Sequence, residues 1–90
     1  MWKIEYKKIF LKELSALPGE YREKIEKLVF NEIAEQNPFS LGFIEKMQGY
    51  KDKYKVRVGN YRIGLTIEKD KMLITVNRVA HRKDIYKIFP

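Results

Sequence analysis

"YKVRVGNYRIGL", residues 54–65, decides the fold of the second half of this chain. Apolar and polar side chains alternate on both sides of Gly59-Asn60, a pattern that predicts two β-strands joined by a two-residue hairpin turn. Such a turn fixes the pairing of the strands, and it places Arg57 directly opposite Arg62, with Lys55 on the same face. Like charges in facing positions weaken a sheet. The arrangement therefore needs a reason beyond stability.

Helices and further strands are predicted on both sides of this hairpin. Period-2 patterns indicate strands, and apolar residues spaced three and four apart indicate amphipathic helices. Pro18-Gly19 ends the first helix, and the second stops before Asn37-Pro38 because the residue preceding proline leaves the helical region. The predicted order is a strand at 1–6, helices at 7–17 and 20–36, strands at 43–48, 53–58, 61–68 and 71–79, and a loop with a short helical turn at 81–90.

These elements predict an α+β fold in a single domain, residues 1–90, with a curled antiparallel meander and the helices packed on one face of it. The predicted core face carries Val56, Val58, Tyr61, Ile63, Leu65, Ile67, Met72, Ile74 and Val76. The predicted open face carries Lys55, Arg57, Arg62, Gly64, Thr66, Leu73, Thr75 and Asn77.

Two positions in this pattern need attention. Arg78 falls on the core face by strict alternation, so either a bulge or a buried acidic partner is needed, and the sequence does not decide between them. Gly64 lies on the open face without a side chain, and we expect that a phosphate could approach the backbone there.

The composition limits the possible classes of protein. Cysteine is absent, which excludes disulfides and thiolate metal sites and fits a reducing compartment. No apolar run approaches the roughly 18 residues of a membrane span. We therefore expect a soluble, cytoplasmic protein without a membrane partner.

The net charge of +7 is unevenly distributed along the chain. Residues 1–40 hold seven basic and seven acidic side chains, whereas residues 41–90 hold twelve basic and five acidic ones. A basic surface confined to one part of a protein is typical of a polyanion binder. The alternative is a charged surface that only confers solubility.

The residues of the open face suggest a chemistry for this charge. An anion between Arg57 and Arg62 would turn their repulsion into attraction, because each guanidinium can offer paired donors to phosphate oxygens. The ending "AHRKDIY" adds cations, a histidine and a tyrosine that could move protons and stabilise charge without a metal. RNA cleavage through the 2′-hydroxyl requires removal of its proton, stabilisation of the phosphorane and protonation of the leaving oxygen. The alternative is that the arginines point into solvent and that His81 and Tyr86 are structural.

Other chemistries find no support in the sequence. There is no Ser/His/Asp or Cys/His order, no glycine-rich phosphate loop and no spacing of metal ligands. No metal site and no cofactor are therefore expected.

The segment "EKMQGYKDKYKVRVGNYRIGLTIEKDKMLITVNRVAHRKDIYKIFP" resembles the RelE/ParE superfamily of toxins from toxin–antitoxin pairs, and it is most similar to the RelE type. Gly49-Tyr50, "YKVRVGNYRI" and "RVAHRKDIY" are the most specific parts. The resemblance covers essentially the whole chain and implies the same fold. It also implies an endoribonuclease that cuts mRNA on the ribosome and arrests translation, held in a hetero-oligomer with a cognate antitoxin.

The resemblance also implies roles for individual residues. Lys55 would hold or deprotonate the 2′-hydroxyl, Arg57 and Arg62 would bind the scissile phosphate, and Tyr86 would stack on a base or assist proton transfer. Arg82 matches the late arginine of the family, and His81 has counterparts in some branches only. The expected catalytic set is Lys55, Arg57, Arg62, His81, Arg82 and Tyr86, and the further RNA-binding residues are Lys51, Lys53 and Lys83.

Two other functions share these features. A ParE-like gyrase poison has the same fold without nuclease activity, and a non-catalytic RNA-binding module would hold RNA without cutting it. Retention of the basic residues together with Tyr86 favours the nuclease.

Overall fold

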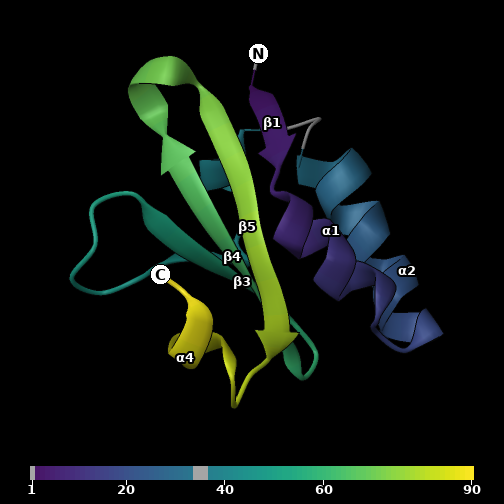
Figure 1. The fold of residues 1–90 in the computed structure, drawn as a ribbon. Coiled ribbons are helices and arrows are strands. Elements are labelled where there is room, and N and C mark those ends of the chain that lie inside the picture. The colour runs from purple at the N-terminus through teal and green to yellow at the C-terminus, as the bar shows by residue number, and fades with distance from the viewer. Residues whose placement is uncertain (1, 34–36) are drawn as a thin grey trace.

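A five-stranded sheet organises the computed structural model, which describes residues 2–33 and 37–90 (Figure 1). The strand order is β1-β5-β4-β3-β2, in which β1 runs parallel to β5 and all other neighbours are antiparallel. The strands are β1 (Lys3–Tyr6), β2 (Ile44–Lys46), β3 (Lys53–Val58), β4 (Tyr61–Glu68) and β5 (Leu73–His81). The helices are α1 (Lys8–Ser15), α2 (Gly19–Lys27), the π-helical turn η1 (Leu28–Glu32), the 3₁₀ turns η2 (Pro38–Ser40) and η3 (Lys69–Lys71), and α4 (Ile85–Ile88).

The predicted α+β architecture is confirmed. Every predicted strand is present, and so are both helices of the helical hairpin and the short helical turn near the end of the chain. The last residues of the predicted 20–36 helix, residues 34–36, lie outside the described residues, as does Met1. Within the described ranges, no helix combines the length and the apolar character needed to cross a bilayer.

The central hairpin has the predicted register, with Arg57 opposite Arg62 and Lys55 opposite Gly64. Its turn depends on Gly59, which has a φ of +58°. A β-carbon at that position would also lie 3.0 Å from the ring of Tyr21 on α2. The turn therefore holds the register by backbone conformation and by packing against a helix.

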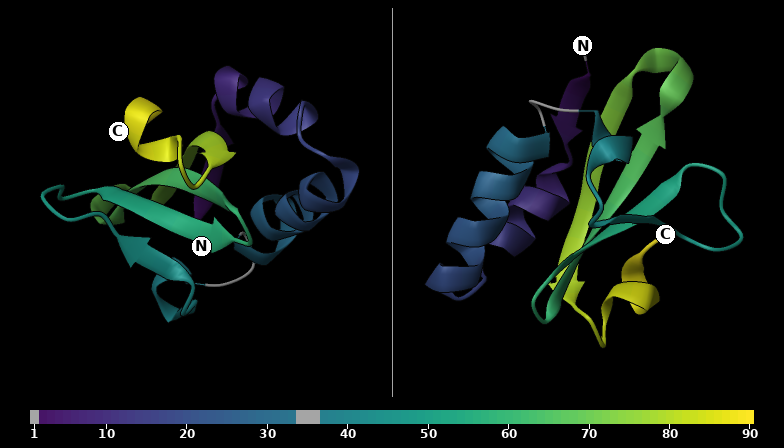
Figure 2. Two further views of the ribbon diagram at one scale, coloured as in Figure 1. Left: turned by 90° about the horizontal axis from the view of Figure 1, so that it is seen from below. Right: turned by 180° about the vertical axis from the view of Figure 1, so that it is seen from behind.

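Helices α1 and α2 with η1 cover one face of the sheet, as Figure 2 shows. The core between the two layers contains most of the predicted residues and consists of Phe10, Leu14, Ile25, Leu28, Val29, Ile33, Tyr54, Val56, Ile63, Leu65, Ile67, Ile74, Val76 and Val79. Tyr6 ties β1 to this helical layer, because its hydroxyl donates to the carbonyl of Val29 at 2.8 Å. Burial raises the pKa of the Tyr6 phenol.

The prediction that Met72 belongs to the core is wrong. Its side chain is 41% exposed, because the residue follows η3 in a left-handed conformation with a φ of +50°. Met72 therefore ends the turn between β4 and β5 and does not begin the strand.

The other face of the sheet is partly covered by α4 (Figure 2). Ile85 and Phe89 are buried against Met47 and Ala80 in a second, smaller apolar cluster. The ring of Phe89 lies so close to Gly64 that a β-carbon there would come within 2.5 Å of it. The expectation that a phosphate could approach the backbone at Gly64 is therefore wrong, since an aromatic ring occupies that space.

Arg78 has both a β-bulge and an acidic partner, the two alternatives that the sequence left open. Gly64 pairs with Arg78 whereas Leu65 pairs with Val76, so a β-bulge inserts one extra residue and turns Arg78 away from the core. An acid then binds it: Glu13 of α1 accepts from Arg78 Nε at 3.1 Å and from Nη2 at 2.7 Å. These hydrogen bonds raise the pKa of the Arg78 guanidinium.

The same carboxylate closes an open sheet edge. Strand β1 ends opposite Val76, and among the described residues no β-strand pairs with the outer edge of β5 beyond that point. Glu13 accepts from the Val79 backbone N–H at 3.1 Å. Helix α1 therefore continues the protection of the edge that β1 begins.

Replacing Glu13 with Ala is expected to lower the free energy of unfolding by about 2 kcal/mol, because a partly buried guanidinium and a backbone N–H both lose their acceptor. Urea denaturation followed by circular dichroism measures this change. The control is Glu5→Ala, which removes an exposed glutamate whose ion pair with Lys3 spans 3.9 Å. The control should stay within about 0.5 kcal/mol of the parent. Equal midpoints for the two variants would show that the Glu13–Arg78 contact contributes no stability.

Candidate functional site

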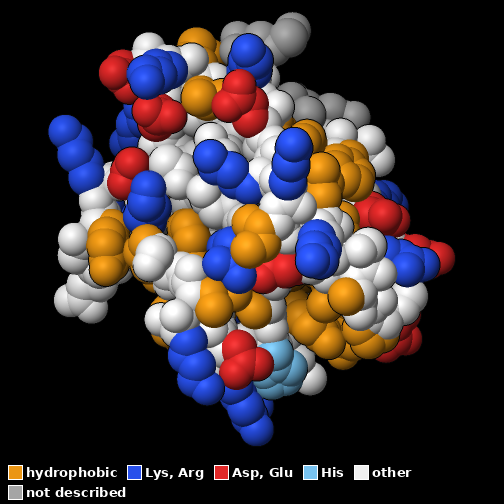
Figure 3. Space-filling view, viewed as in Figure 1, with side chains coloured by type: hydrophobic (Ala, Val, Ile, Leu, Met, Phe, Trp, Pro, Cys, Tyr) orange, Lys and Arg blue, Asp and Glu red, His pale blue; other side chains and the backbone are white. Residues whose placement is uncertain are grey.

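A small hollow on the face of the sheet that carries α4 gathers five side chains of candidate functional residues. Glu45 of β2, Lys55 and Arg57 of β3, Arg62 of β4 and Tyr86 of α4 line a cavity of about 160 Å³. We refer to it as the basic hollow. Figure 3 shows Lys and Arg side chains spread across the face that carries α4.

The pairing of three strands brings these residues together. Glu45 lies opposite Lys55, and Arg57 lies opposite Arg62. Facing residues of an antiparallel pair share one side of the sheet, and residues two apart along a strand do so as well. Lys55 and Arg57 therefore project to the same side, together with their partners on β2 and β4.

Tyr86 is the one residue of the basic hollow that comes from α4 and not from the sheet. Helix α4 is fixed by the buried side chains of Ile85 and Phe89, which leaves Tyr86 58% exposed. Lys55 Nζ donates to the Tyr86 hydroxyl at 2.6 Å, and the same ammonium lies 5.2 Å from the centre of the ring. The lysine and the phenol thus form one hydrogen-bonded unit at the edge of the hollow.

The two arginines have different surroundings. Arg62 Nη1 donates to the carbonyls of Gly59 at 2.9 Å and Tyr61 at 3.0 Å, so the turn itself holds this guanidinium. Arg57 is exposed. A guanidinium has five N–H donors, so both side chains keep donors for an anion in the basic hollow.

Glu45 was not among the residues predicted from the sequence. Within the described residues it is the single carboxylate that lines the basic hollow. The alternation of 43–48 indicated a strand but not its pairing, and only the pairing with β3 places Glu45 opposite Lys55. The site therefore combines one general base candidate with three cations and a phenol.

Comparisons with known proteins agree on the family. The family model described as the ParE toxin of type II toxin–antitoxin systems matches residues 4–86. The toxin RelE3 of Methanocaldococcus jannaschii is 42% identical over 92 residues, which covers 98% of this chain and 99% of that protein. The chain belongs to the RelE/ParE family of type II toxins.

Solved structures show the same likeness. The crystal structure of the RelB-RelE antitoxin-toxin complex from Methanococcus jannaschii matches with a TM-score of 0.76 and 41% identity, over 96% of this chain and 99% of that chain. The isolated RelE toxin of Escherichia coli shares the fold, with a TM-score of 0.66 and 21% identity over 90% of this chain and 84% of that chain. The RelE-like fold predicted from the sequence is confirmed.

Two further basic residues predicted for this RelE/ParE toxin, Lys51 and Lys53, do not line the basic hollow. Lys53 precedes Lys55 by two residues on the same side of β3, and its ammonium donates to Thr66 Oγ1 at 3.2 Å and pairs with Asp52 at 3.3 Å. Lys51 lies in the loop between β2 and β3 and lines two other hollows.

The residues after β5 are the least well placed for the basic hollow. His81 pairs with Tyr61 and its ring lies edge-on to that phenol at 5.7 Å, whereas Arg62 pairs with Ala80. His81 therefore points to the side of the sheet opposite Arg62. The backbone N–H of Arg82 donates to the carbonyl of Asn60 at 2.7 Å, beside the hairpin turn, and its exposed side chain does not line the hollow.

Lys83 is also exposed, and its backbone N–H donates to His81 Nδ1 at 3.2 Å. This contact orients the imidazole without bringing it to the basic hollow. Among the residues that the structure describes, no group of three or more His, Cys, Asp or Glu side chains could hold a metal ion.

Proposed function

We propose that this toxin is a ribosome-dependent endoribonuclease that cuts mRNA by attack of a 2′-hydroxyl on the adjacent phosphate. The reaction leaves a 2′,3′-cyclic phosphate and a free 5′-hydroxyl. The observation that supports this proposal is the combination in the basic hollow of a carboxylate, a hydrogen-bonded lysine–phenol pair and two guanidinium groups.

Arg57 and Arg62 bind the scissile phosphate in this proposal. The pentacoordinate phosphorane carries more negative charge than the substrate, and charge-assisted donors on both strands stabilise it more than the ground state. The arginines thus have a reason to lie opposite each other at a cost to the sheet. They also supply the charge stabilisation that a metal ion provides in other nucleases.

Glu45 acts as the base and Tyr86 as the acid. The Glu45 carboxylate takes the proton of the 2′-hydroxyl, the O2′–P bond forms and the P–O5′ bond breaks. The Tyr86 hydroxyl gives its proton to the leaving 5′-oxygen, and the Lys55 ammonium, which already donates to that hydroxyl, returns a proton to the phenolate. Lys55 donates to Tyr86 in this geometry, which favours a role beside the acid. The resemblance implied instead that Lys55 holds or deprotonates the 2′-hydroxyl.

A cognate antitoxin completes the proposal. The relative from Methanococcus jannaschii is a RelB-RelE antitoxin-toxin complex, and the net charge of +7 favours an acidic partner. We propose that this toxin forms a corresponding hetero-oligomer in the cytoplasm and that Lys53, Lys83 and Arg82 add to the attraction of RNA.

A gyrase poison is the second candidate, because the matching family model describes a ParE toxin. Two assays separate the candidates. A nuclease cuts mRNA on programmed ribosomes and leaves plasmid supercoiling by gyrase unchanged, whereas a gyrase poison gives the opposite result. A toxin that binds RNA without producing 2′,3′-cyclic ends would be an RNA-binding module.

Cleavage is expected to require the 2′-hydroxyl at one nucleotide, so a single 2′-deoxy substitution in the mRNA should abolish the cut at that position. A phosphorothioate at the scissile position should slow the reaction, and Mn²⁺ or Cd²⁺ should not restore the rate, because arginines replace the metal in this mechanism. Programmed ribosomes keep their Mg²⁺ throughout, and primer extension measures the cut. Restoration by a thiophilic metal would contradict the proposed mechanism.

A further inference from the structure

The loop between β2 and β3, residues 47–52, presents an aromatic side chain on a fixed backbone. It projects beside the C-terminus in Figure 1. Met47 anchors its base by packing with Ile85 and Phe89, and the Met47 N–H donates to the Lys53 carbonyl at 2.8 Å. Gly49, with a φ of +88°, makes the turn that leaves Tyr50 47% exposed.

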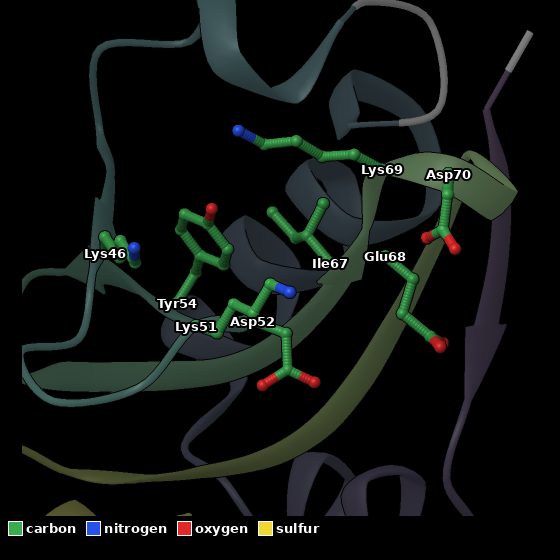
Figure 4. Close-up of a pocket in the computed structure, with 8 residues that line it drawn as sticks. All are labelled: Lys46, Lys51, Asp52, Tyr54, Ile67, Glu68, Lys69 and Asp70. Carbon is green, nitrogen blue, oxygen red and sulfur yellow. The ribbon is translucent and has the colours of Figure 1, made fainter.

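Two hollows meet at this loop. One of about 390 Å³ is lined by residues 46–51, and the larger one, of about 790 Å³, lies between the loop and the tip of the β4–β5 hairpin. Both are lined by Lys46 and Lys51. Figure 4 shows Lys46, Tyr54 and the ammonium group of Lys69 on one side of the larger hollow, and the carboxylates of Glu68 and Asp70 on the other side.

Positive charge is in excess around the loop once the ion pairs are taken into account. Asp52 pairs with Lys53 at 3.3 Å, and Glu68 pairs with Lys71 at 3.2 Å, so two of the three carboxylates there already have cationic partners. Lys46 and Lys51 form no ion pair with any residue that the structure describes. The loop thus combines two cations with an exposed aromatic ring, which is the combination that holds single-stranded nucleic acid.

We propose that Tyr50 stacks on a base of single-stranded RNA while Lys46 and Lys51 bind the adjacent phosphates. This inference rests on the proposed nuclease function and assigns a second contact to its substrate, on nucleotides that flank the cleaved one. Strand β2 connects the two contacts, because Glu45 faces the basic hollow and the next residue, Lys46, lines the hollows at the loop. An RNA strand that crosses the edge of β2 meets both.

RNA fits this loop better than a protein segment does. The apolar side chain at its base, Met47, is 7% exposed and already packed against α4, so the loop offers no aliphatic groove for a peptide. An exposed phenol ring in a hollow that two lysines also line matches a base and its phosphates, which present a flat π-face and negative charge at close spacing.

The test is the binding of a non-cleavable mRNA, 2′-deoxy at the cleavage position, to purified toxin variants, both on programmed ribosomes and as a free oligonucleotide. Tyr50→Ala should raise the Kd about tenfold, whereas Tyr50→Phe, which keeps the ring, should stay within about twofold of the parent. The matched control is Phe30→Ala, which removes an aromatic side chain that is 40% exposed on η1, and it should bind as the parent does. Lys46→Ala and Lys51→Ala should each weaken binding. Each should also lower the slope of log Kd against log salt concentration by about the amount expected for one lost phosphate contact.

Ultraviolet crosslinking then locates the stacked base: a crosslink from Tyr50 to mRNA beside the cleavage position would support the inference, and a crosslink to ribosomal RNA alone would overturn it. Unchanged binding by Tyr50→Ala, or an equal loss in Tyr50→Phe, would overturn the inference. So would a loss of antitoxin affinity in Tyr50→Ala with RNA affinity intact. A parent protein that binds RNA through Tyr50 but does not cut would overturn the proposed nuclease function and leave this contact standing.

Discussion

Replacing Glu45 with Gln is expected to slow ribosome-dependent mRNA cleavage by about 100-fold or more, the usual range for the loss of a general base. Glutamine keeps the size and the hydrogen-bonding capacity of the side chain but cannot accept the proton of the 2′-hydroxyl. Glu45 is exposed and makes no ion pair among the described residues, so the fold should not change. Single-turnover cleavage on programmed ribosomes measures the rate of the chemical step.

Two further variants make this result specific. Glu23→Gln removes an exposed carboxylate on α2, which covers the other face of the sheet, and should cleave at the parent rate. Glu45→Ala leaves room for a small carboxylate, and added formate should restore part of its activity if a proton acceptor is what the variant lacks. A Glu45→Gln protein that retains the parent rate would remove Glu45 from the mechanism.

The hairpin shows which parts of this site can be predicted from a sequence. A two-residue turn allows a single register, so the position of Arg57 opposite Arg62 followed from Gly59-Asn60 alone. Tyr86 could be expected near the sheet because a short helical turn follows the last strand directly.

Glu45 could not be found in the same way. The connection between β2 and β3 runs over residues 47–52, and a loop of that length permits several registers. A shift by one residue would turn Glu45 to the other side of the sheet. Its place in the basic hollow is therefore a property of the tertiary structure.

The bulge at Arg78 shows why strict alternation does not predict the end of β5. One inserted residue reverses the direction of every side chain that follows, so Val79 enters the core and Ala80 packs under α4. The covering of Gly64 by Phe89 was also out of reach, because a sequence pattern does not give the direction in which a terminal helix turns back.

Arg62→Ala is expected to reduce cleavage by about 100-fold, because a charge contact made in the transition state typically contributes about 3 kcal/mol. The fold should hold: the side chain donates to the Gly59 and Tyr61 carbonyls at the exposed turn, and the loss of these contacts is partly offset by relief of repulsion from Arg57. Arg62→Lys keeps the charge but loses the paired donors, so its cleavage rate should lie between that of the parent and that of Arg62→Ala. Arg22→Ala on α2 is the matched control. Single-turnover cleavage and thermal denaturation measure both effects.

The double variant Arg57→Ala/Arg62→Ala decides whether the two guanidinium groups act on one phosphate. If they share an anion, the second substitution should lower the cleavage rate by a smaller factor than it does in the parent protein. The first substitution has then already disrupted the phosphate geometry on which both contacts depend. Independent sites would instead give additive losses. Parent-level cleavage by Arg62→Ala, with an unchanged melting temperature, would mean that the facing arginines are surface charges, and the cost of their repulsion would then have no functional explanation.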